Sequence, residues 1–215
     1  MTPDYSRRQT SAAEEKANSI SHGLGLVASL AAAPILVWPA LRNGGGLAVI
    51  GPAVFAASMV CLYLASTLYH SLPEERGKSF FRILDHAAIF ILIAGSYTPF
   101  TLGVLRGPWG WTLLGLIWSL AIIGLILKAV PSTRYSRASI VLYVVMGWLV
   151  IIAARPVLTK VAVPGIALIV AGGLAYTFGL IFYGMHRLRF NHFIWHLFVL
   201  TGTICHFFAV LWYSD

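Results

Sequence analysis

Charged residues are scarce in this chain. Of its 215 residues only 10% are Asp, Glu, Lys or Arg, and seven of these are acidic. A soluble domain carries about 25% charged residues, so the composition argues against a soluble protein. Hydrophobic residues make up 59% of the sequence. A share this high predicts a polytopic membrane protein.

Cysteine is nearly absent as well. The chain has two, Cys61 and Cys205, and both fall within long apolar runs. Neither is placed to form an extracellular disulfide, so cysteine usage does not indicate a redox compartment. We interpret both as small apolar packing residues.

Long runs of apolar residues make up most of the sequence. A run of about 20 residues is enough to cross roughly 30 Å of hydrocarbon as a helix. The short connections predict an all-α bundle of seven transmembrane helices in a single domain over residues 19–215, preceded by a cytoplasmic tail at 1–18. We expect the spans at about 20–41, 47–69, 83–104, 110–130, 138–157, 163–184 and 191–213.

The net charge of +8 is explained by topology. With a cytoplasmic N-terminus, the outer side holds only Arg42, Arg106, Arg155 and Lys160. The inner side then holds Arg7, Arg8, Lys16, Arg76, Lys78, Arg82, Lys128, Arg134, Arg137, Arg187 and Arg189. This positive-inside bias predicts a multi-pass protein of the inner (cytoplasmic) membrane with its N-terminus inside. The basic excess suits anionic lipid headgroups, so we expect membrane lipids, and no nucleic acid, as partners.

Histidines mark the cytoplasmic end of the predicted bundle. His192 and His196 are four residues apart, so on a helix they share one face and can bind one metal ion. A catalytic zinc usually takes three protein ligands and a water. His70 ends the second span, whose running direction puts it at the same cytoplasmic level. We therefore predict a metal site formed by His70, His192 and His196.

Zinc is the expected cofactor, because neutral imidazoles suit Zn²⁺ and leave one position open for water. Asp85 begins the third span at the same level, and a carboxylate there is a functional candidate. It can act as a base on that water or orient an imidazole, although a pair with Arg82 is the alternative. Ser66, one turn before His70, can donate a hydrogen bond to the water or to a developing oxyanion.

The other histidines are weaker candidates for a role at the metal site. His22 and His86 are candidates for supporting roles beside the metal. His206 lies ten residues beyond His196, about 15 Å along a helix, so it cannot share the same ion. We interpret the first span and the fourth to sixth spans as scaffold and lipid-facing walls.

The third span carries a proline near its outer end. Pro99 stands in Gly95-Ser96-Tyr97-Thr98-Pro99-Phe100. Proline frees a backbone carbonyl and kinks a helix. We expect this stretch to interrupt the span, which could open a cavity.

Several of these patterns resemble one known family. They are Ser66-x-x-x-His70, Asp85, His192-x-x-x-His196, Glu15-x-x-Asn18-x-x-x-His22-Gly23 and the stretch from Ala94 to Phe100. Over nearly its whole length the chain resembles the bacterial hemolysin III family, which is related to the adiponectin and progestin receptors and, more distantly, to alkaline ceramidases. The resemblance implies zinc near the cytoplasmic face, bound by the three histidines that match His70, His192 and His196. It also implies supporting roles for Ser66 and Asp85, a lipid-accessible cavity and, in the ceramidase branch, hydrolysis of a lipid amide.

Three functions are compatible with these features. The first is a zinc-dependent hydrolase of a lipid amide or ester, with its substrate in an intramembrane cavity. The second is a non-enzymatic membrane sensor or homeostasis factor, in which zinc joins the spans structurally. The third is a pore-forming cytolysin, which is disfavoured because no span has a polar stripe fit to line a wide channel. The substrate, the protein partners and the oligomeric state are not specified by the sequence.

Overall fold

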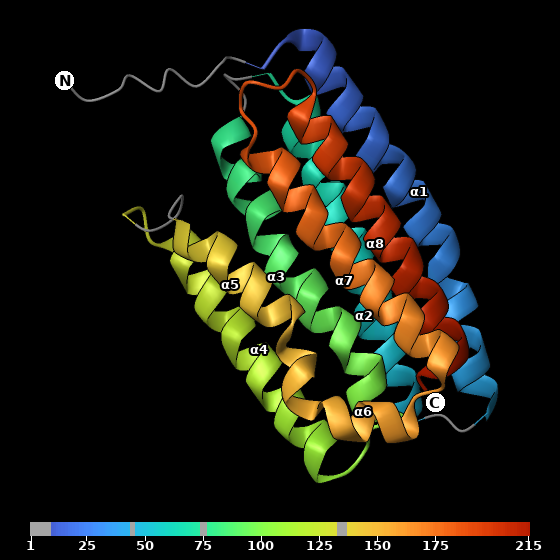
Figure 1. Ribbon diagram of the computed structural model, residues 1–215. Coiled ribbons are helices and arrows are strands. Elements are labelled where there is room, and N and C mark those ends of the chain that lie inside the picture. Colours follow the sequence, from blue (N-terminus) through green and yellow to red (C-terminus); the bar gives the residue numbers. More distant parts are fainter. Residues whose placement is uncertain (1–9, 44–45, 74–76, 133–136) are drawn as a thin grey trace.

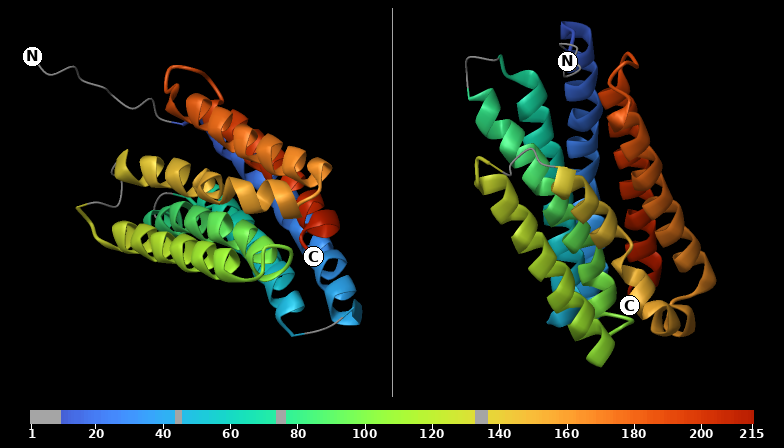
Figure 2. Two further views of the ribbon diagram at one scale, coloured as in Figure 1. Left: turned by 60° about the horizontal axis from the view of Figure 1, so that its bottom comes forward. Right: turned by 60° about the vertical axis from the view of Figure 1, so that its left-hand side comes forward.

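The computed structural model describes residues 10–43, 46–73, 77–132 and 137–215, and these form a bundle of helices. The two views in Figure 2 confirm that most of the helices run side by side, as they do in Figure 1. Seven spans within the described ranges are long and apolar enough to cross a membrane. The predicted all-α seven-helix bundle is therefore confirmed. Its elements are α1 (Ala12–Asn43), α2 (Leu47–Ser71), α3 (Lys78–Leu102), α4 (Pro108–Ala129), α5 (Arg137–Gly147), the 3₁₀ helix η1 (Leu149–Ala153), α6 (Ala154–Lys160), α7 (Val163–Gly184) and α8 (Asn191–Tyr213).

The first helix begins earlier than expected. We placed the first span from about residue 20, but α1 starts at Ala12, so residues 12–18 belong to the helix and not to a loose tail. Ser11 and Glu14 form a reciprocal cap: the Ser11 N–H donates to the Glu14 carboxylate over 2.9 Å, and the Glu14 N–H donates to the Ser11 hydroxyl over 3.3 Å. This capping box satisfies N–H groups that a helix start leaves open.

Four of the basic residues assigned to the inner side lie outside the described residues. They are Arg7, Arg8, Arg76 and Arg134.

The third span is not interrupted at Pro99. Helix α3 continues to Leu102, and the Gly103 N–H donates to the Pro99 carbonyl over 2.8 Å. Pro99 therefore lies in the last turn of the helix, close against α2. A Cβ atom at Gly51 of α2 would lie only 2.6 Å from the Cα atom of Pro99. The proline marks a close helix contact that requires glycine opposite it.

The fifth span is the broken one. Between α5 and α6 the chain passes through η1, and α6 crosses the lower end of the bundle in Figure 1. The Tyr97 hydroxyl of α3 donates to the carbonyls of Met146 (2.9 Å) and Gly147 (3.0 Å) and accepts from the Val150 N–H (3.0 Å). Backbone groups at this depth must be satisfied by protein. One side chain of a neighbouring helix does so here.

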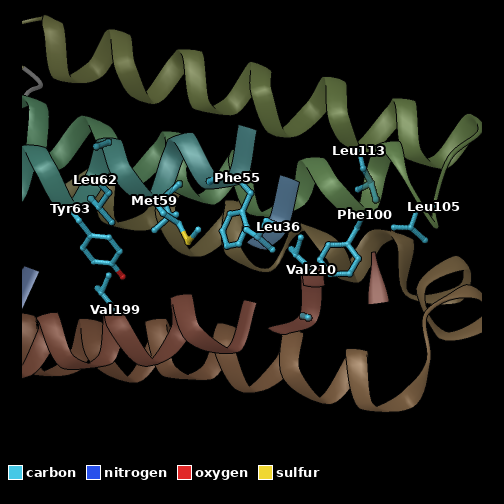
Figure 3. Packing of buried hydrophobic residues seen from close by; sticks show 14 of the residues in the cluster. Leu36, Phe55, Met59, Leu62, Tyr63, Phe100, Leu105, Leu113, Val199 and Val210 are labelled. Carbon is cyan, nitrogen blue, oxygen red and sulfur yellow. The ribbon is translucent and has the colours of Figure 1, made fainter. Parts of the chain in front are cut away.

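The main core is formed mostly by α2, α3 and α8, with further residues from α1, α4 and α6. Figure 3 shows Phe55, Met59 and Tyr63 of α2 facing Val199 and Val210 of α8, and all five are buried. In the most apolar window of each span, 44%, 39% and 44% of the residues of α2, α3 and α8 are buried. The corresponding shares are from 22% to 28% for the other four spans. The three best-buried spans are therefore the ones that carry the predicted site residues, and the others present more of their apolar surface outward.

A smaller core fixes α3 against α4 and α5. Phe90 of α3 is fully buried, and its ring lies 4.4 Å from that of Tyr143 of α5. Ile117 and Ala121 of α4 are buried in the same cluster. This packing sets the position of the end of α4 and the start of α5 relative to the site described below.

We predict that Gly51→Ala destabilises the bundle by about 1–3 kcal/mol, since a methyl group there overpacks the contact with the Pro99 backbone. Thermal unfolding of the purified protein in detergent should show a lower midpoint. Gly115→Ala in α4 is the control, because a Cβ there meets nothing within 4 Å. Equal midpoints for the two variants would contradict the close approach of α2 and α3.

Candidate metal centre

Three histidines meet where α2 ends and α8 begins. His70 lies at the end of α2, and His192 and His196 lie in the first two turns of α8. One potential ligand atom from each lies within 4.8 Å of the other two. The His70 ring centroid is 4.9 Å from that of His192 and 5.0 Å from that of His196. The predicted convergence is thus present, and the cluster could hold a metal ion.

The hydrogen bonds of two of these rings fix their tautomers. His70 Nδ1 lies 2.8 Å from the Glu15 carboxylate, and His196 Nδ1 lies 3.2 Å from the Asn18 carbonyl. A carboxylate or a carbonyl only accepts, so both Nδ1 atoms carry the hydrogen and both Nε2 atoms keep a lone pair. Metal-ligating histidines typically make this kind of contact through the other ring nitrogen.

The ring nitrogens without a hydrogen bond are suited to bind a metal ion. Among the described residues, the Nε2 atoms of His70 and His192 are buried and have no hydrogen-bond partner. A buried polar atom without a partner is costly unless something else satisfies it. A metal ion between the three rings would satisfy both atoms, so the residues present fit such an ion.

Helix α1 supplies the supporting groups, a role that the sequence analysis expected only of its His22. Glu15, Asn18 and His22 follow one another at a spacing of three and four residues, which places them on one face of the helix. Glu15 contacts His70, and Asn18 contacts both His70 (3.5 Å) and His196. We expected α1 to be scaffold and lipid-facing wall. The helical spacing of its polar residues was the signal that could have identified it.

The neighbouring glutamate of α1, Glu14, positions the start of α8. Glu14 Oε1 accepts a hydrogen bond from the Phe190 N–H over 2.6 Å. Phe190 has a left-handed backbone (φ 59°) and immediately precedes α8. Since His192 follows two residues later, Glu14 fixes the entry of the chain into the helix that bears two of the three histidines.

His22 and His86 lie beside the cluster in different ways. The His22 ring stacks on His196, with centroids 3.5 Å apart and planes 5° apart, and meets Tyr63 edge-on at 5.0 Å. His22 thereby restricts the orientation of a cluster ring. His86 Nδ1 donates to the Arg82 carbonyl over 2.8 Å and lies 3.4 Å from the Asp85 carboxylate.

A polar cavity of about 410 Å³ opens beside the cluster. His70, His192 and Asp85 line it, so the predicted carboxylate shares this space with two of the three histidines. Asp85 is only 6% exposed. Ser66 is fully buried one turn below His70 but, in the described part of the chain, lines neither this cavity nor the one described next. Its hydroxyl has no hydrogen-bond partner among the described residues.

A second cavity, of about 120 Å³, is almost wholly apolar. It lies deeper, between α3, α5, α7 and α8, and its lining includes Tyr97 and Phe100 from the stretch around Pro99. His206 also lines it, facing Tyr176 at 5.4 Å and away from the three-histidine cluster. The two cavities adjoin, because four residues line both: Ile89, Tyr143, Leu180 and Trp195.

Comparison with known proteins identifies the family of this chain. A family model described as Haemolysin-III related matches residues 10–207. The chain belongs to the haemolysin III family. It is 47% identical over 213 residues to Hemolysin-3 of Bacillus cereus, covering 99% of this chain and 97% of that protein. It is 44% identical over 200 residues to the Hemolysin-3 homolog of Bacillus subtilis (strain 168), covering 93% and 94%.

A more distant relative comes from animals. The chain is 26% identical over 163 residues to the human Monocyte to macrophage differentiation factor, covering 73% of this chain and 67% of that protein. The resemblance inferred from the sequence motifs is confirmed for the haemolysin III family. Together with the seven apolar helices, membership of this family identifies a multi-pass membrane protein.

We predict that His192→Ala abolishes tight binding of a transition-metal ion, because two imidazoles rarely complete such a site. Mass spectrometric metal analysis of the purified protein should find the ion in the wild type and lose it in the variant. His206→Ala on the same helix is the control and should keep the ion. Equal metal content in wild type and His192→Ala would rule out the cluster as the site.

We predict that Glu15→Gln weakens metal binding about 10- to 100-fold, the usual effect of losing the group that orients a ligating histidine. The amide no longer forces the hydrogen onto His70 Nδ1. Competition with a chelator of known affinity measures the change. Asp215→Asn, the same chemical change at an exposed position at the other end of the bundle, should have no effect. An unchanged affinity in Glu15→Gln would mean that the Glu15–His70 contact does not prepare the ligand.

Proposed function

We propose that this protein is a zinc-dependent hydrolase that cleaves an amide or ester bond of a membrane lipid, near the cytoplasmic face of the inner membrane. One observation carries the proposal: His70 and His192 line a polar cavity that adjoins an apolar one. A lipid with its headgroup in the first cavity and its chain in the second would hold its carbonyl group beside the histidines. The excess of Lys and Arg at this end supports the cytoplasmic orientation.

Zinc is the ion that best suits the donor set. Three neutral imidazoles are a common ligand set of open catalytic zinc sites, whereas magnesium and calcium prefer oxygen ligands. When bound, zinc supplies a Lewis acid that polarises a carbonyl and lowers the pKa of water to about 7. The chain's own contribution is to hold His70 and His196 with their Nε2 lone pairs free, through Glu15 and the Asn18 carbonyl.

The remaining polar residues have roles in the proposed reaction. Water adds to the carbonyl carbon, the C–N or C–O bond breaks, and the products are a fatty acid and an amine or alcohol. Asp85, whose carboxylate lines the cavity, accepts the proton of the water and returns it to the leaving group. In the described part of the chain, Ser66 lies one turn below His70 and lines neither cavity, so we assign its unpartnered hydroxyl to a hydrogen bond with the water at the metal site rather than with the lipid.

A sensor with structural zinc is the second candidate. His70 belongs to α2 and the other two histidines belong to α8, so a bound ion would join these helices. In that case removal of zinc would strongly lower the unfolding temperature, and Asp85→Asn would remain functional in cells. The cavity beside the cluster favours the hydrolase, since a purely structural site needs no space for a substrate.

We predict that the zinc-loaded protein releases fatty acid from at least one class among ceramides, acyl amides and phospholipids, measured by mass spectrometry. Asp85→Asn should lower the rate about 10²- to 10⁴-fold, the usual contribution of a general base, while keeping its zinc. Asp215→Asn is the matched control and should be fully active. Absence of metal-dependent release from all three lipid classes would refute the hydrolase.

A further inference from the structure

The polar cavity has a basic wall that the proposed chemistry does not use. Arg82 of α3, Lys128 of α4 and Arg137 of α5 all line it, so three neighbouring helices each contribute one cationic side chain. Contacts of α3 with α4 and α5, and of α4 with α5, hold these three helix ends together. The histidine cluster belongs to α2 and α8, so the basic wall is a separate part of the same cavity.

Lys128 is the most unusual member of this wall. It lies in the last turn of α4, where a lysine ordinarily extends its ammonium group toward the lipid headgroups. Here the residue is only 3% exposed, and Nζ lies 6.0 Å from the ring centroid of Tyr143. The Tyr143 hydroxyl is held in turn by the His86 carbonyl, to which it donates over 2.7 Å. Lys128 lines the cavity, where its positive charge favours an anion.

A buried hydroxyl stands on the same wall. Ser139 of α5 is 1% exposed and lines the cavity, and its Oγ atom has no hydrogen-bond partner among the described residues. A buried hydroxyl of this kind usually finds an acceptor. An oxygen-rich anion bound between the basic side chains would provide one.

The acidic residues of the cavity are engaged elsewhere. Glu15 contacts His70 and also Lys78 at 3.4 Å, and Glu14 accepts from the Phe190 N–H and from Ser11. The Asp85 carboxylate lies 3.4 Å from His86 Nδ1. The contacts described for these carboxylates are thus with residues other than Arg82, Lys128 and Arg137.

From these contacts we infer that the wall formed by Arg82, Lys128, Arg137 and Ser139 is a phosphate subsite that selects phosphate-bearing lipids. Two guanidinium groups, an ammonium group and a hydroxyl match the several oxygens of a phosphate better than the two of a carboxylate. The adjoining apolar cavity is where the chain of such a lipid fits. This inference builds on the proposed lipid hydrolase, because it names the substrate class of that site.

Binding of dioctanoyl phosphatidic acid, dioctanoylglycerol and inorganic phosphate to the purified full-length protein tests the inference. Titration calorimetry in a phosphate-free maltoside detergent gives the affinities. The first two ligands have the same chains and differ only in the phosphate group. We expect phosphatidic acid to bind at least about tenfold more tightly than dioctanoylglycerol, as suits charge-assisted hydrogen bonds. Inorganic phosphate should bind more weakly than phosphatidic acid, and equal affinities would identify a soluble phosphate as the ligand and overturn the lipid specificity.

Variants assign the binding to the wall. Lys128→Met should weaken phosphatidic acid about tenfold and Ser139→Ala about threefold, with dioctanoylglycerol unaffected. The controls are Lys16→Met, an exposed lysine outside the cavity lining, and Ser119→Ala, an exposed serine of α4. Unchanged phosphatidic acid binding in both wall variants would overturn the inference. Ser139→Ala removes only one oxygen atom, so it tests the wall even if Lys128→Met fails to fold.

The metal-site variant separates this inference from the hydrolase. His192→Ala should still bind phosphatidic acid, since the phosphate contacts α3 to α5. Loss of binding in His192→Ala would show that the phosphate is held by the metal and would overturn the subsite. A wild type that binds phosphatidic acid through Lys128 but releases no fatty acid would retain the subsite and lose the proposed function.

Discussion

The hydrogen bond from His70 to the Glu15 carboxylate is the contact on which the polar end of this bundle depends. It joins α1 to α2 and leaves the buried Nε2 atom of His70 with a free lone pair. Glu15 also pairs with Lys78 at the start of α3, so one partly exposed carboxylate contacts residues at the ends of two further helices. The same face of α1 reaches α8 through the Asn18 carbonyl. Removing α1 would leave His70 and His196 without the hydrogen bonds that fix their tautomers.

The convergence of the histidines was predictable because membrane topology supplies long-range information. Once the spans alternate in direction, the end of the second span and the start of the seventh must lie at one level. A spacing of four residues then puts His192 and His196 on one face. Asp85 follows from the same reasoning, since it begins an outward-running span. These predictions needed no knowledge of side-chain packing, which is why they agree with the structure.

The features that escaped prediction depend on contacts between helices. Glu14 and Glu15 precede the apolar run, so hydropathy assigned them to a tail, although Ser11 and Glu14 carry the spacing of a capping box. The break in the fifth span is marked in the sequence by Pro156, in the first turn of α6, but its backbone is satisfied by Tyr97 from α3. For Pro99 the expectation was wrong in the opposite sense: we expected an interruption, but α3 is continuous through Pro99. Gly51 of α2 leaves room for the close contact with it. Sequence periodicity describes one helix at a time, whereas these features depend on contacts between two helices.

The order of the two cavities along the bundle has a consequence for any lipid that enters. The polar cavity lies at the level of the helix ends, and the apolar one lies deeper, with Tyr143 and Leu180 at their junction. A phospholipid in a leaflet has the same order, headgroup outside and chain inside, so it can occupy both spaces without inverting. The bond between headgroup and chain then lies near the junction, beside His70 and His192. Burial of an acyl chain stabilises the complex by up to about 0.8 kcal/mol for each CH₂ group removed from water, but a chain that moves from the bilayer into the apolar cavity gains little. Discrimination among lipids therefore has to come from the polar end, where the histidines and the basic wall lie.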